Sequence, residues 1–175
     1  MPLGSAETIS LAGMMGSGKS TVGRELARLL GRRLVDTDAE VERLARRPVA
    51  SIFAERGEPA FRALEREVVR GLAGPLVVAL GGGAFCDPGN AEHLIRVGRV
   101  VFLDVSAGEA ARRMDGGGGR PLARQWEELL RARLPLYRRA SLTVPVDGST
   151  ADAVARRVAA LLAAPVPDGT TEVPA

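Results

Sequence analysis

One short segment near the N-terminus constrains this chain more than any other feature. Residues 13–20 read GMMGSGKS and match the pattern G-x-x-x-x-G-K-[ST], whose backbone N–H groups cradle phosphates. Lys19 is the only lysine among 24 basic residues, and all the others are arginine. A lysine brings a slender point charge to the phosphates, where the planar fork of an arginine is too wide. The segment therefore predicts a phosphate-binding loop, the P-loop.

The residues on either side of this loop predict a strand before it and a helix after it. Residues 8–12 read as a short strand with one apolar face, and residues 20–30 carry apolar side chains at helical spacing. Gly31 is placed to cap the C-terminus of that helix. The loop amides would then meet phosphate at a helix N-terminus, where the helix dipole also favours anions. This context predicts a nucleoside triphosphate ligand and leaves the second substrate open.

Length and composition are typical of a single enzyme-sized domain. A chain of 175 residues is long enough for one α/β domain with a sizeable core. No apolar run reaches the roughly 18 residues that a membrane helix needs, and residues 1–7 do not resemble a secretory signal. Cys86 is the single cysteine, so an internal disulfide is excluded. We expect a cytoplasmic protein, monomeric and without a membrane partner.

The charge distribution argues against a nucleic-acid partner. The formal net charge is +3, aromatic residues make up 3% of the chain, and the arginines are spread along it. A nucleic-acid-binding protein usually gathers its basic residues in a stripe with interleaved aromatics. Arginines around small anionic substrates explain the basic bias more simply.

Alternating apolar patterns predict an α/β architecture. Further strands are expected at 34–35, 76–80, 99–103 and 142–146, and further helices at 40–46, 49–56, 59–72, 90–97, 109–114, 126–134 and 152–162. Strands that alternate with helices indicate a parallel sheet covered by helices on both faces, a three-layer α/β/α fold. Ligands of such sheets bind beyond the carboxyl ends of the strands. We expect one domain over residues 1–164 and a loose tail over residues 165–175.

Polar and glycine motifs follow two of these strands. Asp36 and Asp38 stand at a strand end, where one carboxylate would hold Mg²⁺ through water and the other a substrate hydroxyl; a helix N-cap with an acidic first turn is the alternative. The triplet 81–83, Gly-Gly-Gly, ends the 76–80 strand and would admit a ligand close to the backbone, unless it only forms a tight turn.

Three arginines are further candidate site residues. Arg62 and Glu65 are one helical turn apart and would pair, either in a site or as a surface ion pair. Arg120 follows four glycines in what we interpret as a flexible lid over about 113–124, or else as a linker. Arg138 follows the 126–134 helix, where it would clamp a carboxylate or lie in solvent.

Together these motifs resemble the shikimate kinases, P-loop kinases of small molecules that are related in fold to adenylate kinase. The motifs occur in the order and at the spacing of that family over roughly residues 8–162. They are the P-loop, Asp36-Thr37-Asp38, Phe61-Arg62 with Glu65, Gly81-Gly82-Gly83, Arg120-Pro121-Leu122 and Leu136-Tyr137-Arg138-Arg139.

The resemblance implies a five-stranded parallel sheet with a short lid, and transfer of the γ-phosphoryl group of ATP to the 3-hydroxyl of shikimate. The resemblance implies catalytic roles for Lys19, Asp38 and Arg120, and binding of Mg²⁺ by Ser20 and Asp36. It implies that ATP is bound by Gly13, Gly16, Ser17, Gly18, Lys19, Ser20, Thr21, Arg112 and Arg120, with Arg112 against the adenine. It implies that shikimate is bound by Asp38, Arg62, Gly81, Gly82, Gly83 and Arg138.

Two other functions fit parts of this pattern. A kinase of similar fold that acts on another polyol carboxylate, such as gluconate, would share the P-loop and the arginines. A non-catalytic sensor of ATP or shikimate would bind the ligands without transferring phosphate.

Overall fold

The computed structural model contains one sheet of five parallel strands. The structure describes residues 6–115 and 120–164, with the backbone alone for residue 115 and residues 120–124. The strand order is β2-β3-β1-β4-β5. The strands are β1 (Thr8–Ala12), β2 (Arg33–Asp36), β3 (Leu76–Ala79), β4 (Gly98–Asp104) and β5 (Leu142–Pro145). Every strand pair is parallel, which confirms the predicted sheet.

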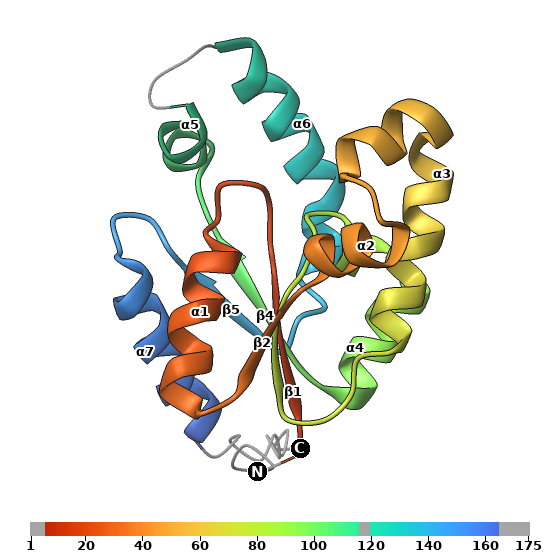
Figure 1. The fold of residues 1–175 in the computed structure, drawn as a ribbon. Helices are drawn as coiled ribbons and strands as arrows, with labels where there is room; N and C mark the ends of the chain where they lie inside the picture. Colours follow the sequence, from red (N-terminus) through yellow and green to blue (C-terminus); the bar gives the residue numbers. More distant parts are fainter. Residues whose placement is uncertain (1–5, 116–119, 165–175) are drawn as a thin grey trace, which may run out of the picture.

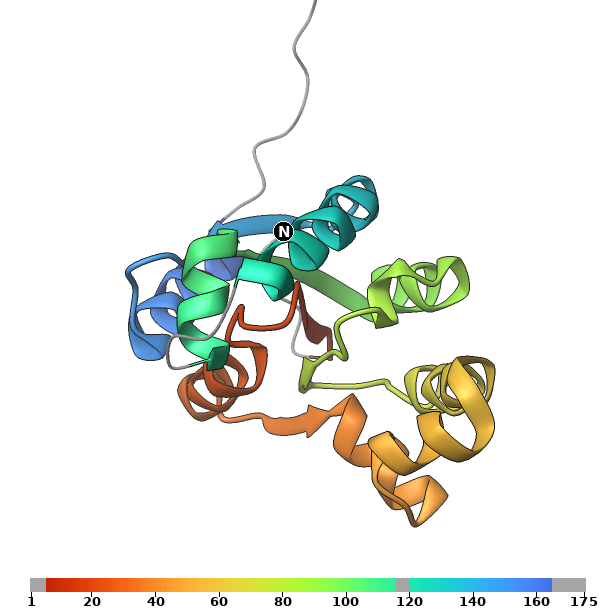
Figure 2. The ribbon, with the colours of Figure 1, turned by 90° about the horizontal axis from the view of Figure 1, so that it is seen from above.

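Helices cover both faces of the sheet and complete the predicted three layers. In Figure 2, α1 and α7 lie on one face, and α4 and α6 lie on the other with α3 beside α4. The helices are α1 (Lys19–Leu30), α2 (Thr37–Ala45), α3 (Val49–Arg70), α4 (Pro88–Val97), α5 (Ala107–Asp115), α6 (Arg120–Tyr137) and α7 (Ala151–Ala163), with a 3-10 turn η1 (Ala84–Cys86).

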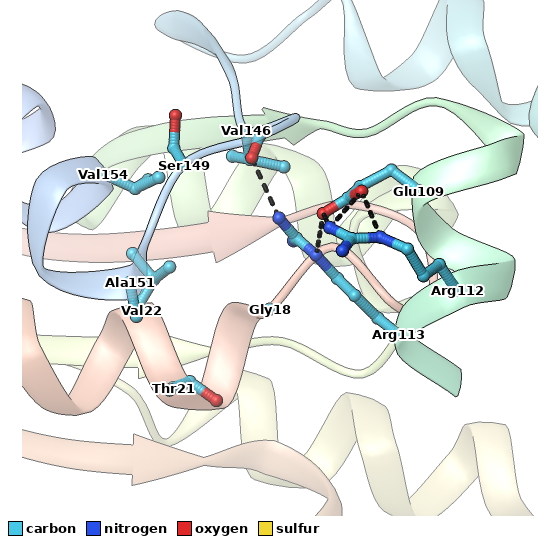
Figure 3. A pocket seen from close by; sticks show the side chains of 10 residues that line it. All are labelled: Gly18, Thr21, Val22, Glu109, Arg112, Arg113, Val146, Ser149, Ala151 and Val154. Carbon is cyan, nitrogen blue, oxygen red and sulfur yellow. Dashed lines mark hydrogen bonds and ion pairs between the residues drawn. The ribbon is translucent and has the colours of Figure 1, made fainter. Parts of the chain in front are cut away.

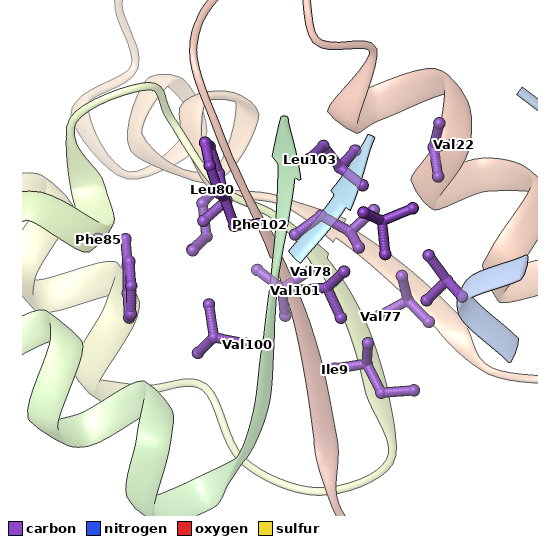
Figure 4. Close-up of a cluster of buried hydrophobic side chains, with 14 of the residues drawn as sticks. Ile9, Val22, Val77, Val78, Leu80, Phe85, Val100, Val101, Phe102 and Leu103 are labelled. Carbon is purple, nitrogen blue, oxygen red and sulfur yellow. The ribbon is translucent and has the colours of Figure 1, made fainter. Parts of the chain in front are cut away.

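The core lies on the three central strands, which are mostly buried on both faces of the sheet. Every residue of β1 is buried, and its neighbours β3 and β4 contribute Val77, Val78 and residues 100–103 (Figure 4). In the register of the sheet, Leu11 lies beside Ala79 of β3 and Val101 of β4. Burial of each large apolar side chain of this kind stabilises the fold by about 1.5–3 kcal/mol.

Helix ends differ most from the sequence prediction at three places. Helix α2 starts at Thr37, because Asp36 caps its N-terminus. The predicted helices 49–56 and 59–72 form one element, α3, with a kink at Gly57, where φ is 75°. Helix α6 runs from Arg120 to Tyr137 and is longer at both ends than the predicted 126–134. In the described part of the chain, none of the helices is both long and apolar enough to span a membrane.

The parallel arrangement brings the loops of interest to one edge of the sheet. The P-loop follows β1, Asp36 ends β2, and the glycine triplet follows β3, so all three lie at the carboxyl ends of neighbouring strands (Figure 1). Helices α5 and α6 rise above this edge in the same view. Residues 116–119 and 165–175, which include part of the expected lid and the expected tail, lie outside the described residues.

Candidate active site

The P-loop wraps around the side chain of its own lysine. Lys19 Nζ donates hydrogen bonds to the carbonyl oxygens of Gly13 and Met14, both at 2.9 Å. Burial lowers the pKa of Lys19 to about 8, against the opposing charges of Asp38 and Asp36. Ser17 Oγ is buried in the same loop and has no partner among the described residues. A charged lysine and an unpaired hydroxyl in a loop that opens helix α1 form a site suited to phosphate.

Asp36 caps helix α2, which is the alternative role that the sequence left open, and it also contacts Ser20. Its Oδ1 accepts hydrogen bonds from the N–H groups of Asp38 and Ala39, at 3.1 and 3.3 Å, and so caps helix α2. Its Oδ2 accepts a 2.8 Å hydrogen bond from the Ser20 hydroxyl. The described residues contain no cluster of three or more acidic, histidine or cysteine side chains that could hold a metal alone. Two hard oxygen donors beside a phosphate loop fit Mg²⁺, which usually keeps several waters and is bound together with substrate phosphates.

Each glycine of the triplet is approached by a different functional side chain. A Cβ atom at Gly81 would lie 2.5 Å from Asp38 Oδ1, and one at Gly83 would lie 2.7 Å from a guanidinium nitrogen of Arg62. A Cβ atom at Gly82 would lie 3.7 Å from Arg133 Nη1. Only glycine lets a carboxylate and a guanidinium come this close to the backbone. The Gly81 N–H is fixed by a 2.8 Å hydrogen bond to the buried Thr37 hydroxyl.

Acidic partners hold Arg62 in place at this triplet. Arg62 donates to Glu65 Oε2 at 2.8 Å and to Glu58 Oε1 at 3.1 Å. The Glu65 side chain is only 1% exposed, and its Oε1 has no partner among the described residues. Burial raises the pKa of Glu65, and the charge of Arg62 opposes this shift. The sequence left open whether Arg62 and Glu65 belong to a site or form a surface ion pair. Because Glu65 is buried, they do not form a surface ion pair.

Asp38 faces the cleft between the P-loop and the triplet. Partial burial of its carboxyl group raises the pKa of that group, and the negative charge of Asp36 raises it further. Lys19 and Arg62 oppose this shift, so the carboxylate stands between two cations. Its side chain as a whole remains accessible to solvent, so a ligand in the cleft would reach it.

Arg133 occupies the place that the sequence analysis gave to Arg138. Arg133 is half-buried and donates from Nη1 to the Gly82 carbonyl oxygen at 3.1 Å. Arg138 is exposed and makes no side-chain hydrogen bond or ion pair within the ranges described. Helix α6 continues through Pro135 to Tyr137, so its inner face carries Arg133 and Tyr137, four residues apart. Arg138, one residue further on, lies away from this face and is not brought to the triplet.

Arg112 is likewise replaced in the site by a neighbouring arginine, Arg113. Arg112 pairs with Glu109 and its side chain is 72% exposed. Arg113 also pairs with Glu109, at 2.8 Å, but reaches over the P-loop, where it approaches the carbonyl oxygens of Gly16 and Ser17 at 3.4 Å and that of Val146 at 2.9 Å (Figure 3). Both arginines line the cavity of Figure 3. Arg113 is the one that closes over the loop.

The side chain of Arg120 lies outside the described residues. Helix α6 begins at Arg120, and this helix rises above the carboxyl edge of the sheet (Figure 1). Its expected contact with transferring phosphate stays a prediction.

Two cavities join along this edge of the sheet. One, of about 270 Å³, lies between α1, α5 and the β5–α7 loop and is lined by Thr21, Val146, Ser149 and Val154 among others. The second, of about 620 Å³, is lined by Lys19, Ser20, Asp36, Asp38 and Gly82. Gly18, Thr21 and Arg113 line both. Together they form a cleft with an apolar end, a central phosphate loop and a charged end, which fits a nucleotide beside a small anionic acceptor.

Sequence reasoning missed four of the residues that build this site. They are Thr37, Arg113, Trp126 and Arg133. The spacing of Arg133 and Tyr137 was a usable signal, because positions i and i+4 share a helix face and Tyr137 also donates to the Gly82 carbonyl oxygen. The Glu109–Arg113 spacing is a second signal of the same kind.

Comparison with known proteins identifies the family. The sequence profile described as shikimate kinase matches residues 15–163. The chain belongs to the shikimate kinase family. It is 44% identical to the shikimate kinase of Mycobacterium marinum over 168 residues, 90% of each chain. It is 48% identical to the shikimate kinase of Thermobifida fusca over 157 residues, 85% of this chain and 91% of the relative.

Solved structures agree with this assignment. The shikimate kinase of Acinetobacter baumannii in complex with shikimate has a TM-score of 0.82 and 36% identity, over 89% of this chain and 92% of that one. A gluconokinase from Sinorhizobium meliloti has a TM-score of 0.58 and 21% identity, over 90% of this chain and 91% of that one. The latter likeness is one of fold alone. The expected five-stranded P-loop kinase fold of the shikimate kinase family is therefore confirmed.

Proposed function

We propose that this chain transfers the γ-phosphoryl group of ATP to the 3-hydroxyl of shikimate, giving ADP and shikimate 3-phosphate. One observation carries the acceptor assignment: three successive glycines are approached by Asp38, Arg133 and Arg62 in turn. Two guanidinium groups suit the single carboxylate of shikimate, and one aspartate suits its ring hydroxyls. The glycines leave room for the ring between them.

The residues of the cleft would divide the work between binding and charge stabilisation. Phosphoryl transfer has a loose transition state, so positioning and electrostatics contribute most of the rate. Lys19 would move from the carbonyl oxygens of Gly13 and Met14 to the β- and γ-phosphates. Asp38 would orient the attacking hydroxyl and accept its proton, which the raised pKa of its carboxyl group favours. Arg120 would stabilise the charge of the transferred group.

Mg²⁺ would be held by the Ser20 hydroxyl and, through water, by Asp36. When bound, the ion neutralises phosphate charge. The 2.8 Å hydrogen bond between these two residues already sets their oxygens side by side. The dual use of Asp36 as helix cap and metal partner ties the metal position to the start of helix α2.

The nucleoside would occupy the apolar end of the cleft. Gly13, Gly16, Ser17, Gly18 and Thr21 belong to the P-loop and the first turn of α1 that would hold the phosphates. We place Arg113, rather than Arg112, beside the base, since its guanidinium lies next to Gly18 and Val146 in this cavity. Arg112 would then contribute through its shared partner Glu109.

We propose that the enzyme acts as a monomer. The single cysteine is compatible with the reducing cytoplasm, where we place the enzyme.

The test is ADP release from ATP and Mg²⁺ with shikimate, with gluconate and without acceptor. The proposal expects release that depends on shikimate. Release with gluconate alone would keep the fold and the P-loop but refute the acceptor roles of Arg62, Arg133 and Asp38. Binding of both ligands without any acceptor-dependent release would indicate a sensor.

A further inference from the structure

Trp126 is the only tryptophan of the chain, and it touches the P-loop from above. Its indole Nε1–H donates a 3.1 Å hydrogen bond to the Met15 carbonyl oxygen. Trp126 is only 4% exposed, although it lies on a helix beside the open cleft. The family motifs of the sequence do not include this residue. A buried donor aimed at the backbone of a phosphate loop calls for a functional explanation.

The inner face of α6 meets the two halves of the site at different points. Trp126, Arg133 and Tyr137 are seven and four residues apart, so they share one face of the helix. Trp126 contacts the P-loop at Met15, while Arg133 and Tyr137 both donate to the Gly82 carbonyl oxygen in the acceptor half. The nucleotide half and the acceptor half are thus held by separate hydrogen bonds.

The hydrogen bond from Trp126 fixes the orientation of a whole peptide unit and not of the Met15 carbonyl group alone. The Met15 carbonyl and the Gly16 N–H belong to the same planar trans peptide and point in opposite directions. Holding one therefore orients the other. On the far side of this peptide Gly16, with φ 81°, packs so closely on α5 that a Cβ atom would lie 2.9 Å from the Ala110 carbonyl oxygen. The peptide is held between α5 and α6.

Lys19 and Trp126 together use three successive carbonyl groups of the loop. Lys19 donates to Gly13 and Met14, and Trp126 donates to Met15. When Lys19 turns to phosphate, as the proposed function requires, its two bonds to the loop are given up. The bond from Trp126 is independent of the nucleotide and can persist.

We propose that Trp126 is a positioning residue for nucleotide binding, which orients the Met15–Gly16 peptide so that the Gly16 N–H faces phosphate. This inference rests on the proposed nucleotide site and adds a residue outside its motifs. Because a loop amide contacts phosphate before and during transfer alike, loss of the bond weakens nucleotide binding and leaves kcat nearly unchanged.

The test compares Trp126→Phe with Tyr137→Phe, each of which removes one hydrogen-bond donor from the same face of α6 and keeps a ring. We expect Trp126→Phe to raise the Kd of a fluorescent ADP analogue and the KM of ATP about two- to tenfold, the worth of one hydrogen bond. The KM of shikimate should stay within about twofold. Tyr137→Phe should give the opposite pattern, with the larger change in the KM of shikimate.

An unchanged nucleotide Kd in Trp126→Phe, with a lowered Tm, would assign Trp126 a packing role only and overturn the inference. Equal rises in both KM values would overturn it as well. If the variant does not fold, the wild-type protein supplies the test, since its one indole reports on Met15. Tryptophan emission should then shift with Mg·ADP and not with shikimate alone, and the reverse would refute the inference. Wild-type ADP release is measured first, so that failure of the proposed function is seen separately.

Discussion

Replacing Arg133 by methionine tests the acceptor site at the point where the structure departs from the sequence motif. Methionine keeps the apolar stem of the side chain and removes the guanidinium group. In the structure Arg133 is half-buried, and one of its nitrogens bonds to the Gly82 carbonyl oxygen at 3.1 Å, which leaves its other donors for a ligand. A hydrogen bond to a charged partner contributes about 1.5–3 kcal/mol.

That energy corresponds to a rise of about tenfold to a hundredfold in the KM of shikimate. The KM of ATP should change much less, because the lost group lies at the acceptor end of the cleft. The matched control is Arg138→Met, an exposed arginine five positions further along, which should stay within about twofold of wild type. Steady-state ADP release with each substrate varied in turn measures both. A large loss in Arg138→Met with little change in Arg133→Met would refute the reasoning.

Three further predictions concern the nucleotide half of the site. Lys19→Ala should abolish turnover, and retained activity would contradict the role of Lys19. In the wild type the affinity for ADP should fall as pH rises through about 8, because burial lowers the pKa of Lys19 to that value and the lysine loses its charge. An affinity for ADP that stays constant from pH 7 to 9.5 would contradict this. Asp36→Asn should keep the helix cap and the Tm but raise the Mg²⁺ concentration needed for activity. Asp36→Ala should in addition lose about 1 kcal/mol of stability in thermal or urea unfolding. The same Mg²⁺ dependence of activity in both variants as in the wild type would contradict the metal role. Arg120→Ala should lower kcat more than it weakens shikimate binding, as kinetics and calorimetry would measure; the opposite result would remove its role in transfer.

The fold was predictable from the sequence because its signals are local. The apolar runs of β3 and β4 are buried on both faces, and such strands carry continuous hydrophobic sequence. The P-loop is fixed by glycines and a lysine at a set spacing. Gly31 caps α1 in the left-handed conformation, with φ 63°, as expected.

The misplaced site residues all depend on helix register, which local sequence does not settle. The prediction ended the helix at Leu134 and so put Arg138 on a following loop. The helix instead tolerates Pro135 and continues to Tyr137, because the stacking of Tyr137 on Phe102 and its bond to Gly82 hold the last turn against the sheet. Arg133 then faces the triplet. In α5 a register difference of one residue separates Arg112 from Arg113.

The contact of Trp126 with Met15 could not be predicted at all. The two residues are 111 positions apart, and their meeting depends on how α6 packs over the loop after β1. Helix periodicity predicts that Trp126 is buried but not which carbonyl group its indole reaches. Long-range contacts of this kind become visible only once the helix and the sheet have been packed together.

The central claim is that this active site phosphorylates the 3-hydroxyl of shikimate, and the product itself tests this most directly. We would incubate the enzyme with ATP, Mg²⁺ and shikimate and assign the phosphorylated position by two-dimensional ¹H–³¹P NMR. The account predicts one product, in which phosphorus couples to the ring proton at carbon 3, formed together with ADP. Phosphate on another hydroxyl, or ADP without a phosphorylated ring, would contradict it.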